Sequence, residues 1–335
     1  MHKKGGEAGR GDIIGGMGNW LQSLSDRDMD AGCFQERTTA AKTLNDSYCT
    51  EKVMRKAVIH FAHANGFPSG TYNKLFELLG PEYSVISIDR LGHSARYPVD
   101  DNWVSLTGEL IQHIEDNCDG PVIGLGHSLG AILNFRAAYE RPGLFQQIIM
   151  LDPPLVYGPF ALFLSAVKKL RLAGRMGPAA VTKGRREEWP SRGEAKAHLR
   201  GKALFSRFDP DCFSDYIENG MVETPSGVRL SFDPKVEVDI FKTTPHDMHR
   251  FNPGMSILGS LVVGEQSEFR RFVGGFAQKH RLYFECFAGG SHLFPLEYPE
   301  ATAALLKRLI NAGRQPPEVT KSRESKGLRP GSVRI

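Results

Sequence analysis

Short apolar runs rich in β-branched residues alternate along this chain with segments of helical periodicity. The runs are continuous rather than alternating, as expected for strands buried on both faces of a sheet: Ala57–Ala62, Val85–Asp89, Val122–Gly126, Ile148–Asp152, Ser260–Val263 and Leu282–Phe287. The helical segments space their apolar residues three or four apart: Tyr72–Leu79, Val104–Asn117, Leu129–Tyr139 and Glu300–Ala312. The alternation predicts an α/β fold with a mostly parallel central sheet flanked by helices.

The regular alternation stops after Asp152 and resumes at Ser260. The intervening stretch, with helical segments and frequent Pro and Gly, predicts a mainly helical cap inserted at residues 155–250 between two parts of a core, 51–154 and 251–313. Residues 1–50 have few large apolar residues, and residues 314–335 are polar and basic. We therefore expect a poorly ordered N-terminal extension and a disordered basic C-terminal tail.

Composition excludes several classes of protein. In 335 residues no apolar run approaches the roughly 20 that a membrane-spanning helix needs, and the polar start lacks the apolar core of a secretory signal. The five cysteines are scattered without a C-x-x-C pair, so we expect free thiols in a cytoplasmic protein with no metal, cofactor or nucleic-acid partner. Residues 165–207 contain twelve Lys and Arg against three Glu, which favours either an anionic substrate or an ordinary solvated helical face.

The most specific motif is G-x-S-x-G, with Ser128 between Gly126 and Gly130, at the junction of a predicted strand and a predicted helix. A tight strand-to-helix turn of this kind raises a serine hydroxyl above the sheet edge, and small neighbours avoid a clash with the close backbone. The following helix directs the Leu129 N–H toward a developing oxyanion. A dinucleotide site is disfavoured, because the third glycine falls one position late for G-x-G-x-x-G.

Four landmarks in order resemble those of the α/β-hydrolase family, in particular serine esterases and lipases with a GHSLG elbow: Ala62–Pro68, Ile88–Ser94, the serine motif and Gly289–His292. The resemblance covers about residues 57–312 and implies an α/β-hydrolase fold. It also implies a second oxyanion donor, the backbone N–H of Phe67, and places Asn65 where histidine is more usual.

A serine nucleophile needs a general base, since its hydroxyl is protonated at neutral pH. We predict His292 for this role, because it follows the last predicted strand by five residues in a Gly-rich loop at the same sheet edge. The acid has three candidates, because the usual G-x-x-D turn reads Gly-Glu-Gln-Ser here, with serine in place of the acid. Asp152, at the end of the strand after the nucleophile helix, is preferred, and Glu265 or Glu268 from a shifted turn are the alternatives.

These residues predict a hydrolase that cleaves a small-molecule carboxylic ester or thioester through a Ser-His-Asp triad and an acyl-enzyme. The predicted pocket comprises Asn65, Tyr157, Phe160 and Trp189. An acyltransferase, a carbon–carbon bond hydrolase and a non-catalytic binding protein on the same scaffold are the competing hypotheses.

Overall fold

The computed structural model describes residues 56–156, 158–170, 172–175 and 177–313, without the side chains of residues 159, 160, 175 and 272. The predicted N-terminal extension, the basic tail and Tyr157 therefore lie outside the described residues. Within the described part, no helix combines the length and the apolar character needed to cross a membrane.

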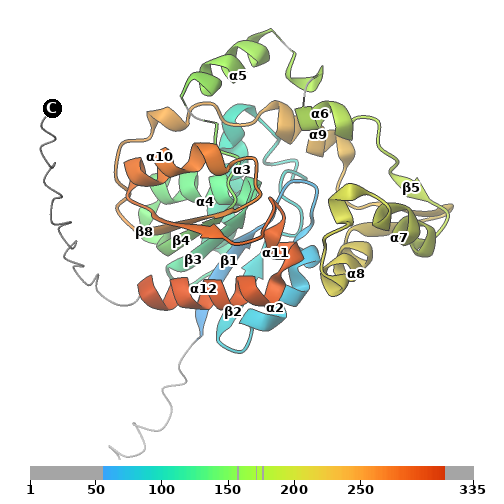
Figure 1. Ribbon diagram of the computed structural model, residues 1–335, viewed down its shortest axis with the longest axis horizontal. Coiled ribbons are helices and arrows are strands. Elements are labelled where there is room, and N and C mark those ends of the chain that lie inside the picture. Colours follow the sequence, from blue (N-terminus) through green and yellow to red (C-terminus); the bar gives the residue numbers. More distant parts are fainter. Residues whose placement is uncertain (1–55, 157, 171, 176, 314–335) are drawn as a thin grey trace, which may run out of the picture. The chain divides into compact units, whose positions relative to one another are not determined.

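The core is a six-stranded sheet in the order β2-β1-β3-β4-β8-β9 (Figure 1). Each pair of neighbouring strands is parallel, which confirms the predicted parallel α/β sheet. The strands are β1 (Ala57–Ala62), β2 (Tyr83–Ser87), β3 (Val122–His127), β4 (Phe145–Leu151), β8 (Leu258–Gly264) and β9 (Tyr283–Phe287). Because parallel strands end at one edge, the residues that follow β3, β4, β8 and β9 are brought together.

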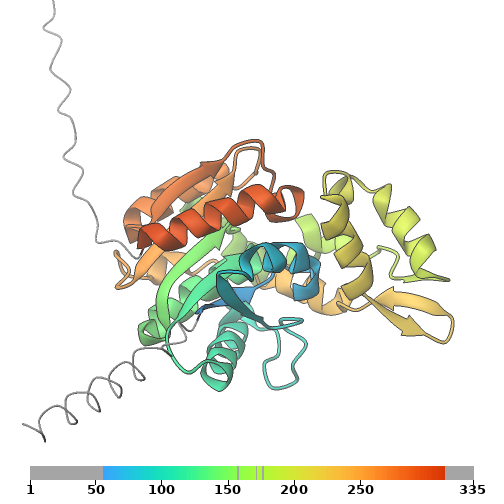
Figure 2. The ribbon, with the colours of Figure 1, turned by 90° about the horizontal axis from the view of Figure 1, so that it is seen from below.

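Helices cover both faces of this sheet (Figures 1 and 2). Leu75, Leu305 and Leu309 pack with Phe61 in one buried cluster, while Leu110, Ile132 and Val273 pack with Ile148 in another. The helices are α2 (Asn73–Leu79), α3 (Val104–Asn117), α4 (Leu129–Glu140), α10 (Arg270–His280), α11 (Phe294–Glu297) and α12 (Pro299–Gly313). Thus α2 and α12 cover one face, and α3, α4 and α10 cover the other.

The chain between β4 and β8, called the insertion below, contains the other helices and strands (Figure 2). Its helices are α5 (Pro159–Lys169), α6 (Gly177–Thr182), α7 (Arg192–Arg200), α8 (Pro210–Asn219) and α9 (Pro234–Lys242). Three of these begin at side-chain caps, where Ser191, Asp209 and Asp233 accept hydrogen bonds from first-turn N–H groups. The insertion also contains a three-stranded antiparallel sheet absent from the prediction: β5 (Glu188–Trp189), β6 (Met221–Thr224) and β7 (Gly227–Leu230).

Candidate active site

The nucleophile candidate, Ser128, lies in a turn that has no room for a side chain at the positions two residues before and two residues after it. A Cβ on Gly126 would approach the Gly130 carbonyl oxygen to 2.2 Å, and one on Gly130 would approach the Ala62 oxygen to 2.0 Å. Ser128 itself has φ 53° and ψ −112° between β3 and α4. Strained non-glycine backbone of this kind concentrates at functional positions.

Three side chains predicted from the sequence meet at the C-terminal edge of the sheet. Ser128 Oγ lies 3.0 Å from Nε2 of His292, and Nδ1 of His292 lies 2.6 Å from Oδ2 of Asp152. Asp152 is fully buried, whereas the His292 side chain is 30% exposed. Asp152 also has a positive φ, 45°, directly after β4. The arrangement can pass a proton from a serine hydroxyl to an imidazole and stabilise the resulting cation.

The Asp152 carboxylate receives two further hydrogen bonds from the turn after β8. The Gly264 N–H donates to Oδ1 at 2.7 Å, and the Ser267 hydroxyl donates to Oδ2 at 2.6 Å. Ser267 is the serine found where the commoner pattern has its acid. Its hydroxyl thus contacts the same carboxylate oxygen as His292, a role that the sequence analysis did not assign to it.

The two alternative acids, Glu265 and Glu268, form no hydrogen bond with His292 in the described part of the chain. Glu265 is exposed and accepts a hydrogen bond from the Gly289 N–H at 2.9 Å, and Glu268 is exposed. The structure therefore brings Asp152, and neither glutamate, to hydrogen-bonding distance of His292.

His127 connects the loop that carries His292 to the core behind it. Its Nε2 lies 2.8 Å from the carbonyl oxygen of His292, and because a carbonyl only accepts, this nitrogen carries the hydrogen. Nδ1 then accepts from the Tyr72 hydroxyl at 2.7 Å. Burial, reinforced by the nearby His292, lowers the pKa of His127 to about 3. His127 is therefore neutral and held in one tautomer near pH 7.

The two predicted oxyanion donors differ in their surroundings. Leu129 is the first residue of α4, so its N–H has no acceptor within that helix. The Phe67 N–H instead donates to the Ala64 carbonyl at 3.1 Å, closing a turn. An oxyanion would have to share or replace that bond, and the role of Phe67 stays a prediction.

Residues 61–305 match the model of the Alpha/beta hydrolase family. The chain belongs to this family. The match covers both parts of the core and the insertion between them, and it confirms the family resemblance found in the sequence.

Curated relatives of this alpha/beta hydrolase include the type I acyl-CoA thioesterase mpaH of Penicillium brevicompactum, 27% identical over 182 residues, or 49% of this chain and 40% of that protein. Human monoglyceride lipase is 33% identical over 113 residues, or 31% of this chain and 37% of the lipase. The alignments thus span less than half the length of either relative. Among solved structures, an E-2-(acetamidomethylene)succinate hydrolase is similar with a TM-score of 0.61 at 19% identity, covering 77% of this chain and 92% of that one, which supports the fold alone.

The predicted pocket residues are only partly placed by the structure. The Asn65 amide donates to the Glu237 carbonyl at 3.0 Å, so it links the loop before Phe67 to α9 of the insertion. Trp189 is buried in β5, 5.8 Å from the His198 ring, and no contact links it to the triad. Tyr157 and the Phe160 side chain lie outside the described residues. The pocket therefore stays a prediction.

Several Arg side chains of the insertion form hydrogen bonds and ion pairs within the protein. Arg207 donates to the Gly289 carbonyl at 2.7 Å and lies 3.3 Å from the Glu297 carboxylate, beside the loop that carries His292. Arg185 donates to Glu237 at 3.1 Å, and a Cβ on Gly66 of the oxyanion loop would approach that carboxylate to 3.0 Å. These contacts leave fewer basic side chains for an anionic substrate, and the sequence pattern alone did not reveal them.

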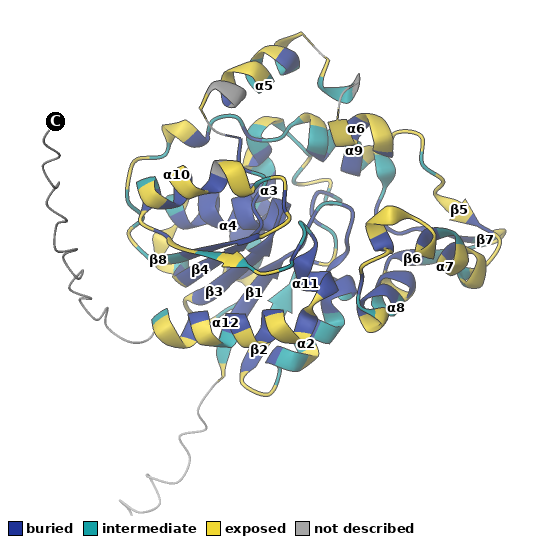
Figure 3. Ribbon diagram, in the orientation of Figure 1, coloured by how far each residue is buried: buried dark blue, intermediate teal, exposed yellow. Residues whose placement is uncertain are grey.

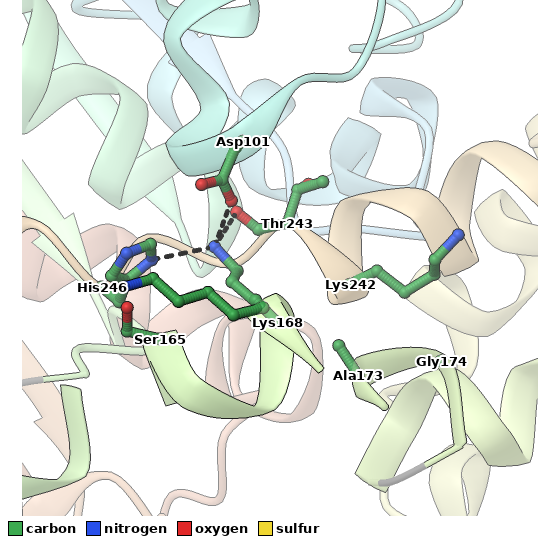
Figure 4. A pocket seen from close by; sticks show the side chains of 9 residues that line it. Asp101, Ser165, Lys168, Ala173, Gly174, Lys242, Thr243 and His246 are labelled. Atoms are coloured by element: carbon green, nitrogen blue, oxygen red, sulfur yellow. Dashed lines mark hydrogen bonds and ion pairs between the residues drawn. The ribbon is translucent and has the colours of Figure 1, made fainter. Parts of the chain in front are cut away.

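A cavity of about 610 Å³ between α5, α9 and the loop before α3 is not lined by Ser128, His292 or Asp152 (Figure 4). Lys168 projects into it, pairs with Asp101 and lies 3.1 Å from Nδ1 of His246 (Figure 4). Burial lowers the pKa of Lys168, while Asp101 opposes that shift. Across the described residues, no cluster of three His, Cys, Asp or Glu side chains has the arrangement of a metal site.

Proposed function

We propose that this alpha/beta hydrolase cleaves a carboxylic ester or thioester through a covalent acyl-enzyme on Ser128. The observation that carries the proposal is the continuous set of contacts from Ser128 Oγ to His292, 3.0 Å, and from His292 to Asp152, 2.6 Å. The names of the thioesterase and lipase relatives support the same class of reaction.

In the proposed acylation step, Nε2 of His292 accepts the hydroxyl proton while Ser128 Oγ bonds to the acyl carbon. Asp152 stabilises the imidazolium, and the N–H groups of Leu129 and Phe67 stabilise the oxyanion. The imidazolium then returns its proton to the departing alcohol or thiol as the bond from the acyl carbon to oxygen or sulfur breaks. A water molecule repeats these steps on the acyl-enzyme, releasing the acid and restoring Ser128.

The decisive experiment measures turnover of nitrophenyl esters, monoacylglycerols and acyl-CoA thioesters of graded chain length by the wild type and by Ser128→Ala. Loss of a triad serine leaves only binding and oxyanion stabilisation, so we expect a decrease in kcat of about 10³-fold or more on every accepted substrate. Ser84→Ala is the matched control, because Ser84 is exposed on the edge strand β2. Unchanged turnover by Ser128→Ala would remove Ser128 from the mechanism.

The same panel tests whether the substrate is anionic. If cations of the insertion bind a phosphate or carboxylate of the substrate, added salt raises KM for acyl-CoA more than for a neutral ester, because salt screens exposed charges. Equal salt dependence for the two substrate types would contradict an anionic specificity.

A further inference from the structure

Large apolar side chains are exposed on the first two helices of the insertion. Leu162 is 74% exposed and Leu170 is 69% exposed at α5, and Val181 is 79% exposed in α6. Figure 3 shows exposed residues along both helices. Scattered exposed leucines are ordinary, but several along one stretch of chain indicate a surface that binds something.

The exposed residues of α5 share one side of the helix. Leu162, Ala166 and Leu170 follow one another at intervals of four, and the exposed Lys169 lies beside them. Ala161 is only 5% exposed, on the opposite side. The helix is thus apolar on its inner side, where it packs, and again on its outer side, where it faces solvent.

The charge of this stretch has one sign. Residues 153–186 contain seven Lys or Arg and no Asp or Glu. Lys168 and Arg185 are paired inward with acids from outside this stretch, whereas Lys169 and Lys183 are exposed. The exposed apolar side chains are therefore accompanied by exposed lysines, and residues 153–186 contribute no carboxylate to offset that positive charge.

We propose that the exposed sides of α5 and α6, which carry Leu162, Leu170 and Val181 with Lys169 and Lys183, dock onto the surface of an anionic phospholipid bilayer. Apolar side chains enter the boundary between headgroups and acyl chains, and lysines bind the negative headgroups. With 11 residues, α5 is far shorter than a bilayer-spanning helix, so it lies in the plane of the surface. The docking depends on this face alone and not on the chemistry of Ser128.

The test is co-sedimentation of the full-length protein with vesicles of phosphatidylcholine, with and without phosphatidylserine. We expect binding to the anionic vesicles to be at least about tenfold stronger, since each lysine at such a surface strengthens binding about fivefold. The variant L162E/L170E should bind at least about tenfold more weakly. K169E/K183E should lose most of the preference for phosphatidylserine.

The matched control is Leu258→Glu, which places the same change on a leucine that is 51% exposed at the start of β8, outside the insertion. It should bind vesicles as the wild type does. Circular dichroism spectra and melting temperatures that are equal in all variants would establish that they are folded. Neither these measurements nor vesicle binding depends on turnover, so failure of the docking is distinct from failure of the proposed function.

The proposal is overturned if the wild type binds neither vesicle, or if L162E/L170E binds as well as the wild type. It is also overturned if sizing shows that L162E/L170E converts a dimer to a monomer while neither form binds vesicles. The face would then be an interface between two copies of the chain.

Discussion

Replacing Ser267 with alanine removes one of three hydrogen bonds to the buried Asp152 carboxylate while leaving Ser128, His292 and Asp152 unchanged. The bond is 2.6 Å long, and Asp152 is fully buried, so bulk water cannot replace the missing donor. A hydrogen bond to a charged group contributes about 1.5–3 kcal/mol. Complete loss of that contribution at the transition state would lower kcat/KM about 10- to 150-fold.

We expect a result near the lower end, about tenfold, because the Gly264 N–H continues to hold Oδ1 of Asp152.

The assay is kcat/KM of the wild type and of Ser267→Ala, Ser267→Thr and Ser260→Ala at one pH. Threonine keeps the hydroxyl and should restore most of the activity, whereas Ser260, equally buried in β8, makes no contact with Asp152 and controls for the loss of a buried hydroxyl. A kcat/KM of Ser267→Ala equal to that of the wild type, with or without a lower Tm, would refute the reasoning.

Two further predictions concern the carboxylate of Asp152 and the buried His60. Asp152→Asn should reduce kcat by about 10⁴-fold, as loss of a triad acid does, while Glu265→Gln should have little effect; steady-state kinetics showing the reverse would move the acid to the turn after β8. Burial, with His113 nearby, lowers the pKa of His60 to about 3, so the folded chain excludes a proton that the unfolded chain binds below about pH 6.5. Stability should therefore fall as the pH falls, by about 1.4 kcal/mol per pH unit for this group, and urea unfolding of His60→Gln should show a shallower pH dependence; equal slopes would contradict the assignment.

Most of the core could be predicted because its central strands, such as β3 and β4, are buried on both faces and therefore read as continuous apolar runs. The structure reproduces β1 (Ala57–Ala62) and α3 (Val104–Asn117) with the predicted bounds, whereas β4 begins at Phe145, three residues before the predicted start. Helix α10 was not predicted, because Gly274 and Gly275 lower its helix propensity and packing on β8 supplies its stability. The antiparallel sheet of the insertion was missed because its strands have only two to four residues.

The candidate site was predictable where local sequence sets the geometry. Ser128 follows from its flanking glycines and strand-to-helix position, and His292 from its loop after the last strand. The choice among the acids depends on the pairing of β4 with β8, which brings Asp152 beside the turn that carries Ser267. Contacts between residues more than eighty positions apart, such as the hydrogen bond from Arg207 to the carbonyl of Gly289, could not be read from local pattern.

The most direct test of the central claim is reaction of the protein with a fluorophosphonate, followed by peptide mass analysis. If His292 activates Ser128, the peptide containing Ser128 gains the phosphonyl group. The label is then absent in Ser128→Ala and forms about 10³-fold or more slowly in His292→Ala, since the oxygen lacks its base. No labelling of the folded wild type, or labelling at another residue with the same rate in both variants, would contradict the account.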